Sequence, residues 1–157
     1  MPFRLRKDAR DWFRGIQSTL GLDFDIYYFC LMAGLATGRR TSPPASEATD
    51  LAQDFPGDYR SRGRTLVALL IARELKTLGV GYKERVTLHK EISKLIDPQS
   101  AAHLSSIGMD AMNQYSFGGF DVLTEWFEDR PRHLETFLPQ LRARLHEAVS
   151  NDTASPG

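Results

Sequence analysis

Residues 23–40 read DFDIYYFCLMAGLATGRR, and this stretch predicts the element around which the rest of the chain folds. Its apolar side chains, between positions 26 and 36, cover almost the whole circumference of a helix at ~100° per residue. A helix that is apolar all round must be covered by other elements on every side. We therefore expect a central helix here, with Phe29 buried in the core.

Charged residues stand at both ends of this stretch. Either Asp23 or Asp25 is expected to cap the helix, because a carboxylate accepts hydrogen bonds from free first-turn N–H groups. Gly38 is a natural helix end, and Arg39 and Arg40 follow at the negative end of the dipole. At ~1.5 Å per residue the two ends lie about 20 Å apart, so Asp25 and the two arginines cannot act on one phosphate within one chain.

The rest of the chain shows helical periodicity interrupted by glycine and proline. The run TLVALLIA at 65–72 predicts a second central helix, with Leu70 in the core. The fold class is all-α, a compact bundle of about six to seven helices with at most one short N-terminal strand. We expect helices over 7–20, 23–38, 59–78, 83–96, 97–115, 120–127 and 131–149, a break at 118–119, a strand or extended arm over 3–6, and a loop with a helical turn over 41–58.

The length of 157 residues favours one helical domain, residues 1–149, followed by a disordered tail over 150–157. The single cysteine, Cys30, excludes an internal disulfide and lies in an apolar run, which predicts a buried thiol and a cytoplasmic setting. No N-terminal segment resembles a signal peptide, and no apolar run reaches the ~20 residues of a membrane span.

The formal net charge is zero, but charge is segregated along the chain. The balance is +3 over 1–40, −4 over 41–58, +6 over 59–96 and −5 over 97–157. Because binding follows the local field rather than the sum, a neutral chain can still bind an anion. Two interpretations stay open: solvated helix faces of arbitrary charge, or a positive face for an anionic ligand.

The segment DYRSRGR, residues 58–64, favours the anionic ligand. Arg60, Arg62 and Arg64 lie beside Tyr59, where the loop enters the next expected helix. Arginine at a helix start opposes the dipole, so a role other than helix stabilisation is indicated. Arginines together with free N–H groups at a helix start form a natural phosphate site. Together with Arg39 and Arg40, they flank the acidic loop over 41–58. Two interpretations of these five arginines stay open: scattered surface charge, or a face that binds a polyanion.

Metal-dependent chemistry has one weak sequence signal. Asp58 is followed by Glu74-Leu75-Lys76, a spacing similar to the PD-(D/E)xK pattern of metal-dependent nucleases. In that pattern the Glu and Lys side chains lie on one face of a strand. Residues 71–79 here are expected to be helical, and side chains two positions apart on a helix point ~200° away from each other. We interpret the match as coincidental. The four histidines also lack the mutual spacing of zinc ligands: His89, His103, His133 and His146.

The order of the N-terminal elements is similar to that of a ribbon-helix-helix DNA-binding protein. FRLR at 3–6 precedes an amphipathic helix, Gly21 and then the apolar helix. Proteins of this class insert a basic pair of strands into the major groove. One strand cannot form that ribbon, so this interpretation requires a homodimer.

Residues DIYYFCLMAGLATG (25–38) and FPGDYRSRGRTLVALLIARE (55–74) resemble a family linked to bacterial DNA phosphorothioation gene clusters. The family is the SspB-like nicking components of the single-strand phosphorothioation (Ssp) system. The first forty residues also resemble DndE of the related Dnd system. The resemblance covers about residues 3–96. It implies a cytoplasmic, DNA-binding antiviral defence protein that nicks one strand with a divalent metal, and it implies three partners: a cysteine desulfurase, an ATPase and a sulfur-transfer enzyme.

The first hypothesis is therefore a metal-dependent DNA nickase acting with Mg²⁺ or Mn²⁺. Phosphodiester hydrolysis needs an activated water and positive charge on the phosphate. Asp25 and Asp58 are the candidate metal ligands or bases, and Glu74 is a third candidate catalytic carboxylate. The candidate DNA contacts are Arg39, Arg40, Tyr59, Arg60, Arg62 and Arg64.

Two alternatives belong to other functional classes. A non-catalytic DNA-binding or scaffold subunit would use the same arginines, and nicking of supercoiled plasmid distinguishes it from a nickase. A helical adaptor that binds only protein would use exposed aromatic residues around 117–127. A lack of DNA retention at every salt concentration favours that adaptor.

Overall fold

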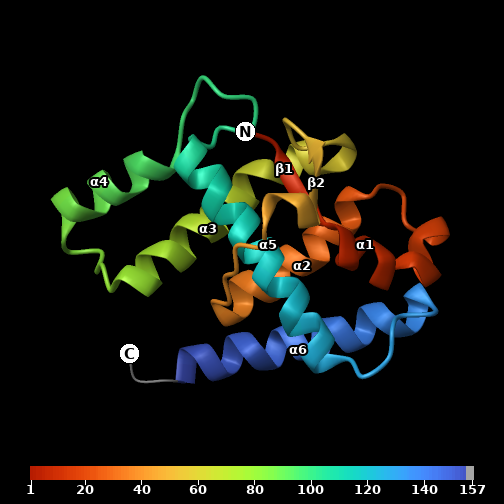
Figure 1. The fold of residues 1–157 in the computed structure, drawn as a ribbon. Helices are drawn as coiled ribbons and strands as arrows, with labels where there is room; N and C mark the ends of the chain where they lie inside the picture. Colours follow the sequence, from red (N-terminus) through yellow and green to blue (C-terminus); the bar gives the residue numbers. More distant parts are fainter. Residues whose placement is uncertain (155–157) are drawn as a thin grey trace.

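The computed structural model describes residues 1–154 and shows a mostly helical chain with one short antiparallel sheet (Figure 1). The expected all-α class is thus confirmed in its coarse form, with the sheet as an addition. The α-helices are α1 (Lys7–Trp12), α2 (Phe24–Thr37), α3 (Gly63–Leu78), α4 (Arg85–Leu95), α5 (Ser106–Trp126) and α6 (Leu134–Ala154). The 3-10 helices are η1 (Arg14–Thr19), η2 (Ala45–Glu47) and η3 (Gly57–Arg62), and the strands are β1 (Phe3–Arg6) and β2 (Ala48–Ala52).

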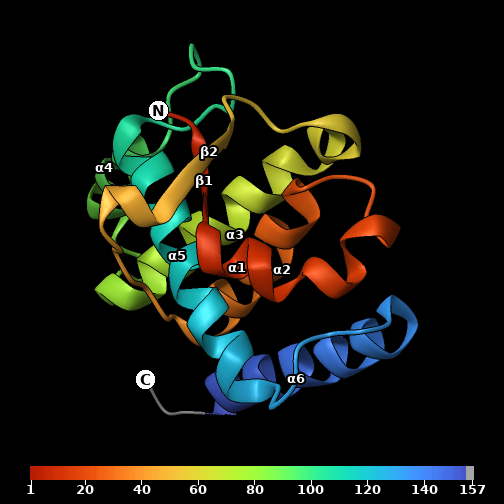
Figure 2. The ribbon, with the colours of Figure 1, turned by 45° about the vertical axis from the view of Figure 1, so that its right-hand side comes forward.

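Helix α2 lies at the centre of the molecule and crosses α5 at backbone distance (Figures 1 and 2). A Cβ atom added at Gly119 would lie 1.6 Å from the carbonyl oxygen of Cys30, and one at Gly34 would lie 1.9 Å from that of Tyr115. Only glycine allows two backbones to approach so closely. The expected break at 118–119 is therefore wrong: α5 continues through both glycines, because they contact α2 instead of making a turn.

Aromatic rings on α2 fix the elements that surround it. Phe24 meets Phe3 of β1 edge-on at a centroid distance of 5.1 Å and Tyr59 of η3 at 4.8 Å. Phe29 packs against Phe137 of α6 at 5.7 Å. Edge-on and tilted pairs of aromatic rings stabilise a fold by more than the burial of their apolar area alone. The expected central helix is confirmed, and Phe29 is only 9% exposed.

Helix α3 buries one face only, which differs from the second central helix expected there. Leu70 is fully buried, as expected, but the neighbouring Leu69 is 39% exposed. The second central position belongs to α5, which forms the largest interface with α2. Apolar residues are common on protein surfaces, so the apolar composition of 65–72 did not imply burial on every side.

Strand β2 replaces part of the loop expected over 41–58. It pairs antiparallel with β1, and Arg4 lies opposite Asp50 and Arg6 opposite Ala48. The Arg4 guanidinium donates to the Asp50 carboxylate at 3.0 Å. A five-residue strand held by its partner needs little intrinsic strand propensity, which is why its composition did not reveal it. Because β1 finds a partner strand in its own chain, the sheet does not require a second copy.

Helix α5 begins later than expected. Residues 97–105 form turns instead of its first helical turns. The Asp97 carboxylate accepts from the N–H of Gln99 at 2.9 Å, an arrangement typical of an Asx turn, so it does not cap a helix. The cap is Ser105, whose hydroxyl accepts from the N–H of Gly108 at 3.0 Å.

Helix α6 ends later than expected. Residues 150–154 are helical, so the expectation of a disordered tail is wrong for them, and residues 155–157 lie outside the described residues. The Asp152 carboxylate lies 3.1 Å from Arg73 of α3 and also pairs with Lys76. These ion pairs hold the end of α6 on α3.

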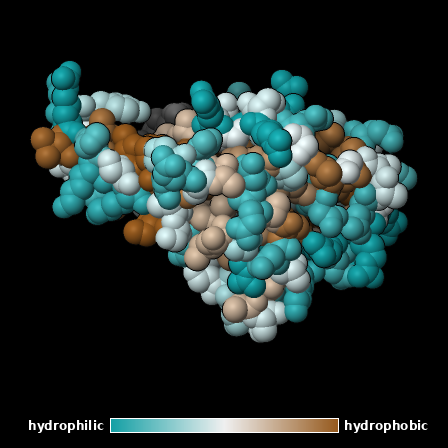
Figure 3. All heavy atoms as spheres, turned by 90° about the horizontal axis from the view of Figure 1, so that it is seen from above, coloured by the Kyte–Doolittle hydropathy of each residue, from teal (hydrophilic) through white to brown (hydrophobic). Residues whose placement is uncertain are grey.

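The α3–α4 hairpin is largely exposed. Leu78, Tyr82 and Val86 are 55%, 84% and 85% exposed. Seen from above, hydrophobic atoms appear among hydrophilic ones toward the left of the molecule, the end where α4 lies (Figure 3). Helix α4 therefore extends away from the core and leaves most of its surface open.

The close crossing of α2 and α5 predicts that replacing a glycine at the crossing lowers the stability of the fold. Gly119→Ala should destabilise the fold by about 3 kcal/mol, because the added methyl group forces the two helices apart. Alanine in an unconstrained helix would instead stabilise it by about 0.5–1 kcal/mol. Gly81→Ala is the control, with its nearest neighbouring atom 3.9 Å away and an expected change within about 0.5 kcal/mol. Urea unfolding measures both, and a Gly119→Ala protein as stable as wild type would contradict the crossing.

Candidate nucleic-acid interface

Tyr59 holds η3, which carries the arginine-rich segment, against the start of α2. Its ring packs against Phe24 and Tyr28, at centroid distances of 4.8 and 5.4 Å. Its hydroxyl donates a hydrogen bond to Oδ1 of Asp25. Burial and this hydrogen bond raise the pKa of Tyr59, so the phenol stays a neutral donor. The position of η3 is thereby fixed relative to α2.

A pocket between the start of α2 and η3 brings four expected site residues together. Its volume is about 430 Å³, and its lining includes Asp25, Asp58, Tyr59 and Arg62. Asp25 is half-buried, and its Oδ2 accepts from the N–H of Leu22 at 3.1 Å. The Asp58 side chain is exposed and forms no ion pair or hydrogen bond within residues 1–154. Asp25 thus has a structural role, whereas Asp58 is free to meet a ligand.

The side chains of Arg60, Arg62 and Arg64 form what we call the η3 arginine cluster. All three are exposed, and none forms an ion pair with another residue that the structure describes. They lie within five consecutive positions at the junction of η3 and α3, and the first turn of α3 contains no acidic residue. Their charges therefore add within one small region of the surface.

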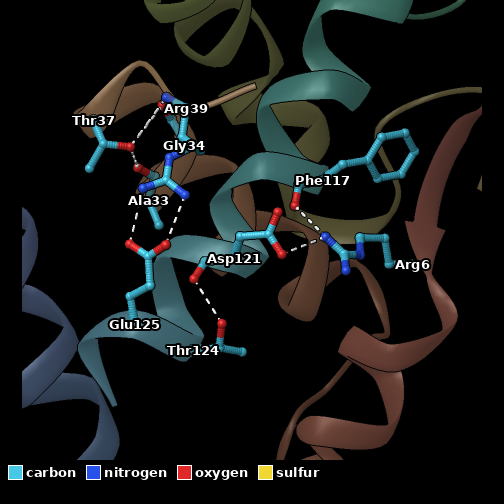
Figure 4. Close-up of polar contacts among 9 residues, drawn as sticks. All are labelled: Arg6, Ala33, Gly34, Thr37, Arg39, Phe117, Asp121, Thr124 and Glu125. Atoms are coloured by element: carbon cyan, nitrogen blue, oxygen red, sulfur yellow. Dashed lines mark hydrogen bonds and ion pairs between the residues drawn. The ribbon is translucent and has the colours of Figure 1, made fainter. Parts of the chain in front are cut away.

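Arg39 and Arg40 are paired inside the chain, unlike the η3 arginine cluster. Arg39 makes two hydrogen bonds to the Glu125 carboxylate, at 2.9 and 3.0 Å (Figure 4). This contact lowers the pKa of Glu125. Arg40 donates to Glu74 at 2.7 Å and to the side-chain oxygen of Gln114. The structure thus divides the five expected arginines into two groups, of which only the η3 arginine cluster forms no ion pair among the described residues.

Glu74 lies apart from Asp25 and Asp58. Its Oε1 accepts from Arg40 and from the Tyr115 hydroxyl, each at 2.7 Å. Arg40 follows the end of α2, whereas Asp25 lies in the first turn of this 14-residue helix, which is about 20 Å long. The three expected catalytic carboxylates are therefore not brought together, and Glu74 lies on a helix, as expected.

Asp25 and Asp58 are the two carboxylates that line this pocket. In the part of the chain that the structure describes, no three His, Cys, Asp or Glu side chains are grouped to hold a metal. Mg²⁺ keeps several waters and commonly binds through one or two carboxylates plus substrate phosphates. Two carboxylates lining one pocket suit that mode, and Mg²⁺ or Mn²⁺ stays a prediction for this place.

The ends of α2 are satisfied differently from the expected capping. Asp23 makes no side-chain cap, and its carboxylate instead lies 3.4 Å from the Arg10 guanidinium. Gly38 ends the helix with a φ of 78°, as expected. Arg73 of α3, which the sequence did not single out, donates to the carbonyl oxygen of Leu35 at 2.7 Å. No local pattern could reveal this contact, since 38 positions separate the two residues.

The aromatic residues of 117–127 are buried or half-buried. Phe117 and Phe120 are 8% and 5% exposed, and Phe127 packs on Phe137 at 5.2 Å. The expectation of an exposed aromatic surface is wrong for Phe117 and Phe120, whereas Trp126 and Phe127 are half-buried and line a pocket beside α6. Of the surface on which the adaptor hypothesis depended, these two half-buried rings remain.

The expected burial of the single cysteine is confirmed in the structure. Cys30 is buried, and burial raises the pKa of its thiol, so it is a core residue and not a reactive nucleophile. None of the helices in residues 1–154 has the length and apolar character needed to cross a membrane.

Comparisons of the chain with protein-family models, curated proteins and solved structures found no match. The SspB-like resemblance of residues 3–96 therefore stays a prediction, and the site is argued from its geometry.

The different roles of the two pocket carboxylates predict different effects on stability. Asp25→Ala should cost about 1–3 kcal/mol, because it leaves the Tyr59 hydroxyl and a backbone N–H without their acceptor. Asp58→Ala should change stability by less than about 0.5 kcal/mol, because its side chain has no described partner. Urea unfolding midpoints measure both. Equal losses would contradict the assignment of Asp25 as the residue that anchors η3.

Proposed function

We propose that the chain is a DNA-binding protein whose η3 arginine cluster contacts the phosphate backbone. The observation that carries this proposal is that Arg60, Arg62 and Arg64 are exposed, adjacent and without ion pairs within residues 1–154. A guanidinium is always charged at neutral pH and matches phosphate with two parallel hydrogen bonds. Three such groups together attract a polyanion strongly.

The use of arginine elsewhere in the fold supports this proposal. The arginines that join elements of the fold form ion pairs with carboxylates: Arg4, Arg6, Arg39, Arg40 and Arg73. Those side chains stabilise the fold, and their charges are largely compensated. The η3 arginine cluster has no such internal use, so its charge is available to an external anion.

Nicking of one DNA strand is a second function, favoured by the pocket that adjoins the cluster. Arg62 belongs to the η3 arginine cluster and also lines the pocket with Asp25 and Asp58. A phosphate bound by Arg62 would therefore lie next to two carboxylates. Hydrolysis needs a group that takes a proton from water and a positive charge on the phosphate, and Asp58 and Arg62 suit these roles. A divalent ion held by the two carboxylates would supply an activated water.

The SspB-like resemblance adds a biological setting to the proposal. It implies cytoplasmic antiviral defence together with a cysteine desulfurase, an ATPase and a sulfur-transfer enzyme. A scaffold subunit of the same complex would need the η3 arginine cluster but not the pocket carboxylates. The two versions of the proposal therefore differ at Asp58.

Salt dependence tests the DNA-binding proposal. Neutralising three phosphates contributes about 2.7 to the slope of log affinity against log salt for duplex DNA. Changing Arg60, Arg62 and Arg64 together to Ala should therefore weaken binding and flatten the slope by about that amount. Arg132, Arg142 and Arg144 are also exposed, so their triple change to Ala removes the same charge from the α6 side. Fluorescence anisotropy measures both proteins, and equal weakening by the two triple variants would contradict a localised phosphate site.

Asp58→Asn tests nicking separately from binding. The change keeps the shape of the side chain and removes its charge, so DNA binding should hold or tighten. Nicking of supercoiled plasmid with Mg²⁺ or Mn²⁺ should fall by about 10²-fold, the scale of a positioned acid–base group. Wild-type protein with a chelator is the control for metal dependence. Nicking by Asp58→Asn at the wild-type rate would remove Asp58 from the proposed chemistry.

A further inference from the structure

A groove lies beside the η3 arginine cluster, between the first half of α3 and the turn at residues 97–103. Its volume is about 730 Å³, within the range of roughly 300–1,000 Å³ that small-ligand pockets occupy. The floor is apolar and includes Val67 and Ile71 of α3 and Ile96 at the end of α4. Val67 is nearly buried, while Ile71 and Ile96 are half-buried, so a ligand can reach apolar surface there.

The rim of the groove is positively charged. Arg60 and Arg64 line it, and both are exposed without an ion pair among the residues that the structure describes. Asp54 is the one carboxylate of the lining, and its Oδ1 accepts from the N–H of Phe55 at 2.7 Å. Two guanidiniums against one carboxylate leave a net positive rim above an apolar floor.

The far wall of the groove is pre-formed. The N–H of Asp97 donates to the carbonyl oxygen of His103 at 3.0 Å, and Ile96 pairs with Leu104 in a short bridge. His103 has a φ of 60°, an uncommon conformation for a residue other than glycine. Its exposed side chain lines the groove, and an imidazole ring can stack on a nucleic-acid base.

We infer that this groove receives one unstacked nucleotide of single-stranded DNA, with the base on the apolar floor and the adjoining phosphates on Arg60 and Arg64. A nucleotide combines a flat, largely apolar face with an anionic phosphate, which matches the floor and rim. A base inside a duplex is stacked and paired and cannot reach such a floor. The inference rests on the proposed DNA binding and specifies the form of DNA that is bound.

Filling the groove tests the inference without changing any charge. Ala68 is exposed and lines the groove, so Ala68→Trp should occupy the place of the base. Binding of a single-stranded oligonucleotide of about twelve nucleotides should weaken about tenfold, while binding of the duplex of the same sequence should change less than about twofold. Ala72→Trp is the matched control, since Ala72 is exposed one turn further along α3 and does not line the groove. It should bind both forms like wild type.

A second variant tests the wall if Ala68→Trp does not fold. His103→Asn removes the ring and keeps a residue type that tolerates a positive φ. It should weaken single-strand binding about fivefold, and His89→Asn on the exposed face of α4 should not.

The outcomes separate the inference from the proposal on which it rests. Selective loss of single-strand binding in Ala68→Trp and His103→Asn supports the groove. Wild-type protein that binds duplex as well as single strand, with no effect of either variant, overturns the groove and leaves DNA binding in place. Wild-type protein that binds neither form overturns the proposed function itself.

Discussion

The backbone of α5 lies directly against the backbone of α2 at Gly34 and Gly119, and the positions of the other elements follow from this crossing. A buried asparagine on α5 connects the crossing of α2 and α5 to the sheet. The Asn113 side-chain oxygen accepts from the Tyr27 hydroxyl of α2 at 2.8 Å and from the N–H of Arg4 in β1 at 3.1 Å. Because buried polar groups need partners, this junction specifies one arrangement of α2, α5 and β1.

The candidate site depends on the same central helix. The start of α2 carries the rings on which η3 packs, and Asp25 fixes η3 through the Tyr59 hydroxyl. The η3 arginine cluster is therefore displayed on a supported segment and not on a free loop. A supported segment loses less conformational freedom on binding than a mobile tail, so its ordering cost would be lower.

The sequence predicted those features whose cause is local. The all-round apolar pattern predicted the burial of α2, and Gly38 predicted its end. Features that depend on distant partners could not be read in the same way. A glycine pair such as 118–119 is compatible with a break or with close helix contact, and only the position of α2 decides between them.

In the candidate site, too, the local features could be predicted from the sequence and the contacts between distant residues could not. The exposure of Arg60, Arg62 and Arg64 followed from their position in a polar segment before a helix. Arg40 pairs with Glu74, 34 positions away, so neither side chain lies in the site where it was expected. No local pattern signals such a contact. The groove beside α3 was also missed, because its floor and wall come from segments that are separated in the sequence.

The proposed DNA-binding surface is formed by η3 and the start of α3. A titration of isotope-labelled protein with a single-stranded oligonucleotide at low salt, followed by the backbone amide resonances in NMR spectra, tests it most directly. We expect the largest shifts at residues 57–64 and in the turn at 97–103, with small shifts at Arg39 and Arg40. Shifts centred on the end of α2 or on α6, with 57–64 unchanged, would contradict it.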